Sequence, residues 1–130
     1  MAKKFLYRGK EVDELQRMPL DEFIKLIPSK PRRTLKRMGH KIKKFLEKFR
    51  EYKKKNKTKP FRTHSREMVI LPEMLGSRFQ VHLGNGFQEM LLQPQMLGHR
   101  LGEYAITTKQ VKHSGPGIGA TRGSKSVELK

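Results

Sequence analysis

Residues 79–92 read FQVHLGNGFQEMLL, and this stretch determines the class of fold. Its first apolar residues, Phe79, Val81 and Leu83, alternate with polar ones, which is the period of a half-buried strand. Gly84-Asn85-Gly86 is a strong turn signal, and the remaining residues return as a second strand. The stretch therefore predicts a β-hairpin. A hairpin alone is marginally stable in water, so its apolar face requires cover from other elements.

Helices that precede the hairpin are predicted to supply that cover. Residues 18–27 favour a short helix, which Pro28 and Pro31 are expected to end. A longer amphipathic helix follows; Gly39 is expected to interrupt it with a turn near residues 37–40, and its firm part is expected over about residues 41–53. Its apolar seam, spaced by three and four residues, consists of Leu35, Met38, Ile42, Phe45, Phe49 and Tyr52.

This seam is compatible with three kinds of packing. A coiled coil is disfavoured because the seam covers fewer than three heptads and lacks alternating flanking charges. A helix lying on anionic lipid is the second alternative, since such helices are also basic and amphipathic. Only 35% of the chain is hydrophobic, so the seam is needed to build a core. We therefore expect it to pack on the rest of the domain and expect no membrane partner.

The predicted fold class is α+β, with N-terminal helices packed on a small sheet that contains the hairpin. Met68-Val69-Ile70-Leu71 is interpreted as a further short buried strand, and residues 94–101 as one or two helical turns at most. The predicted organisation is a basic N-terminal arm at 1–17, one domain at 18–106 (helical part 18–56, sheet part 66–106) and an extended, basic, Gly-rich tail at 107–130.

Positive charge is concentrated in the middle of the 130-residue chain. Residues 29–66 hold 17 of the 30 Lys and Arg but only two acids, Glu47 and Glu51, so they carry most of the net charge of +18. Such a block attracts a polyanion at long range, and nucleic acid is favoured because neutralised phosphates release counterions. A solvated, solubilising surface is the alternative explanation.

Enzymatic and metal-dependent functions find no support in the sequence. The chain has no Cys, and its five His residues show no ligand spacing, so we expect no metal and no cofactor. No nucleophile and base stand in register, and we expect no enzymatic activity. Residues 115–120 match a dinucleotide-binding pattern, but the flanking residues, a Lys/His/Ser/Gly stretch before it and Gly-Ser after it, predict neither the strand nor the helix that such a loop requires. Neither a signal peptide nor a membrane-spanning run is present, which favours a cytoplasmic protein.

Five short motifs occur in one order and carry a resemblance. They are Thr63-His64-Ser65-Arg66, residues 70–76 (ILPEMLG), Val81-His82, residues 96–105 (MLGHRLGEYA) and residues 116–122 (PGIGATR). Together they resemble the S-nineteen family of small-subunit ribosomal proteins, over about residues 62–122. Tyr7-Arg8-Gly9 and Met18-Pro19-Leu20 are similar to the archaeal and eukaryotic branch of that family, and the brevity of the chain favours an archaeal member.

The resemblance implies a structural protein of the ribosome with helices on a three-stranded sheet. It implies a place in the head of the small subunit, with 16S ribosomal RNA and the neighbouring head protein S-thirteen as partners. It also implies a C-terminal tail directed toward the decoding region, where tRNA is a partner, and no homo-oligomer. The family's cation at the hairpin turn is absent, since Leu83-Gly84-Asn85 stands there, and the family's Arg after Ala105 is kept at best as Lys109.

Two other function classes stay open at this point. One is a protein–protein adaptor that docks a partner helix on an exposed seam; the other is a DNA-binding module, which the scarcity of base-reading side chains on the helix disfavours.

For the RNA-binding function, Lys48 lines the basic helix with the other cations. The predicted RNA-binding residues are Arg32, Arg33, Lys36, Arg37, Lys41, Lys43, Lys44, Lys53, Lys54, Lys55, Lys57, Lys59, Arg62, Thr63, His64, Ser65, Arg66, Arg78, His99, Arg100, Thr108, Lys109, Lys112, His113, Arg122 and Lys125.

Overall fold

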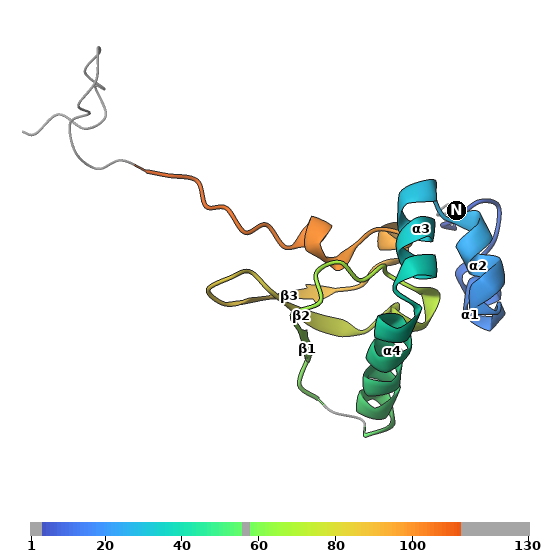
Figure 1. Cartoon of the computed structure of the whole chain (residues 1–130), viewed down its shortest axis with the longest axis horizontal. Coiled ribbons are helices and arrows are strands. Elements are labelled where there is room, and N and C mark those ends of the chain that lie inside the picture. Colours follow the sequence, from blue (N-terminus) through green and yellow to red (C-terminus); the bar gives the residue numbers. More distant parts are fainter. Residues whose placement is uncertain (1–3, 56–57, 113–130) are drawn as a thin grey trace, which may run out of the picture.

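The helices form two groups beside a small sheet (Figure 1). The computed structural model describes residues 4–55 and 58–112. Helices α3 and α4 lie next to the sheet, and α1 and α2 lie beyond α3 (Figure 1). The helices are α1 (Val12–Arg17), α2 (Leu20–Leu26), α3 (Ser29–Arg37) and α4 (Gly39–Lys54), with short 3-10 turns at η1 (Pro72–Met74), η2 (Pro94–Met96) and η3 (Leu101–Tyr104).

The α+β class is confirmed, and the sheet is mixed. Its strands are β1 (Phe61–Thr63), β2 (Arg78–His82) and β3 (Phe87–Leu91), in that spatial order. The predicted hairpin is present as β2 and β3, which pair antiparallel. The first strand, β1, pairs parallel with β2. A parallel pair requires a long crossover, and the buried segment between β1 and β2 provides it.

The predicted strand at Met68-Val69-Ile70-Leu71 is wrong, although its burial is confirmed. All four residues are buried, but they lie outside the sheet. Their backbone pairs instead with the segment before η3: the Ile70 amide donates to the His99 carbonyl at 2.8 Å. The Leu101 amide donates to the Met68 carbonyl at 3.0 Å. β1 pairs with the edge of β2 that β3 leaves open. The apolar run at 68–71 therefore forms its hydrogen bonds with the segment before η3 instead.

The seam of the basic helix builds the core, as predicted. Phe49 on α4 contacts Phe79 on β2 with ring centroids 5.4 Å apart, and Phe45 contacts Phe61 on β1 at 5.6 Å. Leu35, which α3 contributes, is 4% exposed. Because the seam is covered by the chain itself, the exposed docking seam that the adaptor hypothesis requires is absent from the described part of the chain.

The helical region differs from prediction at Pro31 and at its beginning. Pro28 does separate two helices, but Pro31 lies inside the first turn of α3, where a missing amide hydrogen costs nothing. Within the segment interpreted as an arm, residues 12–17 form α1, whose Leu15 is buried in the core. The turn of Tyr7 to Lys10 also packs on the domain through the Tyr7 ring. The predicted domain boundaries themselves stay a prediction.

Candidate nucleic-acid interface

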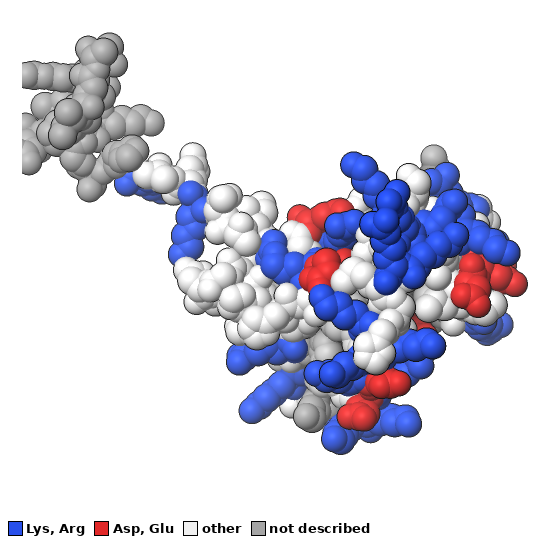
Figure 2. Space-filling view, viewed as in Figure 1, with Lys and Arg blue, Asp and Glu red and all other residues white. Residues whose placement is uncertain are grey.

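The exposed side of α4 is lined by lysines because its apolar residues face the sheet. Its buried residues, Ile42, Phe45, Leu46 and Phe49, recur at helical spacing, which leaves the intervening positions in solvent. Figure 2 shows Lys and Arg gathered over α3 and α4. The α4 cations that the structure leaves exposed are Lys41, Lys43, Lys44, Lys48, Arg50, Lys53 and Lys54.

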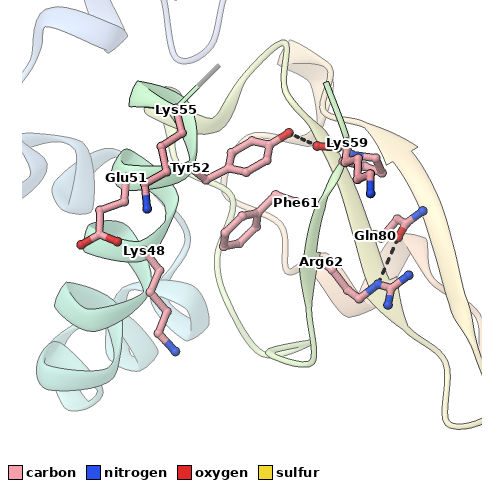
Figure 3. A pocket seen from close by; sticks show the side chains of 9 residues that line it. Lys48, Glu51, Tyr52, Lys55, Lys59, Phe61, Arg62 and Gln80 are labelled. Atoms are coloured by element: carbon pink, nitrogen blue, oxygen red, sulfur yellow. Dashed lines mark hydrogen bonds between the residues drawn. The ribbon is translucent and has the colours of Figure 1, made fainter. Parts of the chain in front are cut away.

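A groove lies between α4 and β1 (Figure 3). It has a volume of about 700 Å³, and the rings of Tyr52 and Phe61, whose centroids are 5.3 Å apart, lie within it. A second hollow of about 450 Å³ continues it toward the start of α4. Lys48, Phe61 and Arg62 line both, so the two form one surface, which we call the α4–β1 groove.

Cations dominate the charge of this groove. Its lining holds one carboxylate, that of Glu51. One of the cations, Lys41, is 3.1 Å from Glu67, which lies outside the lining. A hydrogen bond from its own backbone, aided by Lys41, holds the pKa of Glu67 below its usual value. The groove cations are Lys41, Lys44, Lys48, Lys55, Lys59 and Arg62.

Two arginines predicted to bind RNA hold the fold together in the structure. Arg32 donates to the carbonyls of Ile24, Lys25 and Ile27 at 2.9–3.2 Å, and so satisfies the carboxyl end of α2. Arg66 donates to three other carbonyls, those of His82, Gly102 and Ala105, at 2.5–3.1 Å. Their role in RNA binding stays a prediction.

The four residues at 63–66, all predicted to bind RNA, are divided between interior and surface. Thr63 is buried, and its hydroxyl oxygen accepts a hydrogen bond from the Ser65 amide at 3.1 Å. Arg66 faces inward to its three carbonyls. His64 is exposed, and Ser65, which is half-buried, lines the groove.

Three further predicted residues have partners within the chain. Arg100 donates to the Thr34 hydroxyl at 2.8 Å, which ties α3 to the segment before η3. His99 lies 2.6 Å from a Glu103 carboxylate oxygen, and Arg78 lies 3.8 Å from Glu89.

The remaining predicted RNA-binding residues are distributed over separate places. Arg33, Lys36 and Arg37 are exposed on α3, and Lys53 and Lys54 lie in the last turn of α4. Thr108, Lys109 and Lys112 lie on an exposed segment that runs away from the domain (orange in Figure 1), so they do not join the groove. Lys57, His113, Arg122 and Lys125 lie outside the described residues.

Sequence reasoning missed the aromatic and amide side chains of this region. Tyr52 was assigned to the core seam, yet it also lines the groove with Phe61 and Gln80. His82 and Phe87 were not proposed as site residues, although they face each other across the hairpin. The signal that could have identified this pair is the register of the predicted hairpin, because residues directly opposite in an antiparallel pair share a face.

Neither a metal centre nor a membrane span is found in the part of the chain that the structure describes. Residues 4–55 and 58–112 hold no group of three or more potential ligands that could bind a metal ion. Within the same ranges, no helix has the length and apolarity to cross a bilayer. The chemistry that the described surface offers is attraction and hydrogen bonding to anions, with aromatic rings nearby.

Comparison with known proteins identifies a matching family and a similar relative. Residues 33–113 match the family model described as "Ribosomal protein S19". A relative from Saccharolobus solfataricus, described as "Small ribosomal subunit protein uS19", is 50% identical over 130 residues. The alignment covers 98% of this chain and 93% of that relative.

Proposed function

Because the chain belongs to the ribosomal protein S19 family, we propose that it binds 16S ribosomal RNA as a structural constituent of the small ribosomal subunit. The family predicted from the five motifs is confirmed, and the similarity to a Saccharolobus protein supports the archaeal branch. This family consists of ribosomal proteins rather than enzymes. The proposal for this chain is that most of its affinity comes from lysine and arginine contacts to phosphates.

The observation that carries the proposal is the α4–β1 groove. Its six cations surround a continuous surface with one carboxylate: Lys41, Lys44 and Lys48 stand on α4, Arg62 stands on β1, and Lys55 and Lys59 lie in the connection between the two elements. Lysine is a point charge that suits phosphate rather than base edges. Structured RNA presents mainly shape and backbone, so recognition through this groove is largely of geometry.

The finer assignments follow from the family resemblance. We propose a place in the head of the small subunit beside S-thirteen, with the C-terminal tail directed toward the decoding region and tRNA, and a cytoplasmic location with the ribosome. The exposed residues 106–112 fit a tail that needs a partner, since Ile106 and Val111 are each 71% exposed. These apolar side chains have nothing to pack on within the described domain.

Neutralising two groove lysines tests the proposal. We expect Lys44→Gln with Lys48→Gln to weaken binding to a 16S RNA head fragment and to reduce the steepness of its salt dependence by about 1.4–1.8 in log–log slope. If the wild type makes about eight phosphate contacts, a rise in salt from 50 to 200 mM should lower its affinity roughly 10³- to 10⁵-fold. Filter binding across that range measures both quantities.

The matched control removes two exposed cations outside the groove, with Arg17→Gln and Lys25→Gln. This variant has the same net charge as the groove variant, so it isolates the position of the charges. Equal losses in both variants, or a salt slope near zero for the wild type, would contradict the proposal. Duplex DNA that competes as well as the RNA at equal salt would favour a general DNA-binding module instead.

A further inference from the structure

The face of the sheet that points away from the helices carries a cluster of rings. Phe79 and Val81 on β2 are fully buried against the helices, so the alternate residues of the strands face the other side. On that side lie Arg62, His64, His82 and Phe87, which we call the outer-face cluster. None of these four belongs to the buried core.

The rings of this cluster are in mutual contact. The imidazoles of His64 and His82 have centroids 4.5 Å apart and are inclined by 35°. The Phe87 ring stands edge-on to both, at 5.2 Å from His64 and 5.0 Å from His82. The guanidinium carbon of Arg62 lies 4.5 Å from the Phe87 centroid, which is a cation–π distance. The four side chains thus form one continuous surface of planar groups.

Hydrogen bonds hold two of these groups in place. The Nδ1 atom of His82 accepts a hydrogen bond from the Gly84 amide at 3.2 Å. The Nε atom of Arg62 donates to the Gln80 side-chain oxygen at 3.3 Å (Figure 3). Side chains that are already ordered before binding lose less conformational entropy when a ligand binds. The cluster is therefore preorganised as well as accessible.

Water reaches this cluster, and cations adjoin it. His64 and Arg62 are exposed, and His82 and Phe87 are half-buried. Arg62 and His64 also line the α4–β1 groove, so the cluster continues that groove around the edge strand β1. Glu89 also lies on this face, and its carboxylate is 3.8 Å from Arg78. A ligand that suits both surfaces has a chain of negative charges with planar groups attached.

We propose that the outer-face cluster is a stacking surface for unpaired bases of RNA whose phosphates lie along the α4–β1 groove. This inference rests on the proposed RNA-binding function and deepens it. Unpaired bases stack on aromatic side chains and on guanidinium planes, whereas bases inside a continuous duplex are not available for this contact. Stacking tolerates every base because each has a π-face, so we expect a preference for single strands without sequence specificity.

Stabilisation of the hairpin is the competing explanation for these rings. His82 and Phe87 are directly opposite across β2 and β3, and such aromatic pairs stabilise a sheet. A purely structural role predicts variants that unfold more easily but bind RNA normally once folded. The two explanations therefore differ in what a folded variant does with RNA.

The test uses Phe87→Leu and His64→Ala, with Phe5→Leu as the matched control. Phe5 is 37% exposed and lies in the N-terminal segment, so its substitution removes an accessible ring outside the cluster. Circular dichroism and urea titration first establish that each variant is folded. The probe is a single-stranded RNA of about ten nucleotides with a central 2-aminopurine, a length within the range of such sites.

We expect the wild type to quench 2-aminopurine fluorescence and to bind this strand more tightly than its duplex. His64→Ala should bind the strand about 5- to 150-fold more weakly, as loss of one stacked base predicts. Phe87→Leu should lose the quenching while its salt slope stays that of the wild type, and Phe5→Leu should match the wild type in every measurement.

Folded cluster variants that bind and quench like the wild type would overturn the stacking surface. If the salt slope is intact in that case, the proposed function stands and only the stacking inference fails. A wild type that binds neither the strand nor the 16S fragment at low salt would overturn both.

Discussion

At the scale of single residues, arginine and lysine have different roles in this protein. Arg32 and Arg66 each donate to three backbone carbonyls, and Arg50 makes a bidentate pair with Glu73 at 2.7 and 3.1 Å. That pairing raises the pKa of Arg50 above its usual value. The α4 lysines Lys43, Lys44 and Lys48 instead lie exposed on the surface. A guanidinium has five donors in a planar fork and is weakly hydrated, whereas an ammonium group is strongly hydrated.

Replacement of Arg66 by lysine tests this division. Arg66→Lys keeps the charge but cannot reach the carbonyls of His82, Gly102 and Ala105 together. We expect the free energy of unfolding in urea to fall by about 1.5–3 kcal/mol, the range for hydrogen bonds to charged groups.

The control for that experiment is Arg33→Lys on the exposed face of α3. Its free energy of unfolding should change by less than about 0.5 kcal/mol, as at other surface positions. A similar loss at both positions would show that the inward hydrogen bonds of Arg66 contribute little to stability.

At the scale of elements, the break between α3 and α4 lies at Met38, inside the turn predicted near residues 37–40. Met38 has φ −99° and ψ 26°, which lies outside the helical region, and α4 begins at Gly39. Gly39 itself has no positive φ and no atom within 4 Å of an added Cβ. Gly98, in contrast, has φ +77°, and an added Cβ would lie 2.7 Å from the Tyr7 hydroxyl oxygen. Glycine is therefore required at Gly98 but not at Gly39.

Alanine at these two positions should have opposite effects. Gly39→Ala should raise the free energy of unfolding by about 0.4–1 kcal/mol, because the unfolded chain loses freedom. Gly98→Ala should lower it by more than about 1 kcal/mol, because the left-handed conformation and the Tyr7 contact both oppose a side chain. Urea titrations of the two variants measure the difference. Equal effects would show that the docked Tyr7 turn does not constrain the backbone at Gly98.

At the scale of the whole molecule, the core and the charge are arranged on opposite sides of α4. One side packs on the sheet and the other carries the lysines, so a single helix joins folding to the proposed RNA binding. Salt affects these two properties differently, because it screens phosphate contacts but not the buried apolar core. The ribosomal association should therefore weaken at salt concentrations at which the domain is still folded.

Sedimentation of a cell lysate tests that association. We expect the protein to migrate with the small ribosomal subunit at moderate salt and to leave it as salt is raised. The variant with Lys44→Gln and Lys48→Gln should leave at lower salt than the variant with Arg17→Gln and Lys25→Gln. Migration as a free protein at low salt would contradict a ribosomal role and leave only a basic nucleic-acid-binding domain.

The sequence by itself determined the features that depend on short-range patterns of residues. The hairpin at 79–92 follows from alternation and a glycine turn, and the lysine face of α4 follows from helical spacing. The family followed from motifs that stand in linear order. Each of these features depends on residues close together in the chain.

The tertiary structure decided what depends on residues far apart. It selected Phe61–Thr63 rather than the apolar run at 68–71 as the partner of β2, since a strand edge pairs with whichever segment the crossover brings to it. It directed Arg66 inward to carbonyls 16 to 39 residues away and assembled the outer-face cluster from three strands and their flanking residues. Local periodicity contains no information on such pairings, because they depend on where the chain returns.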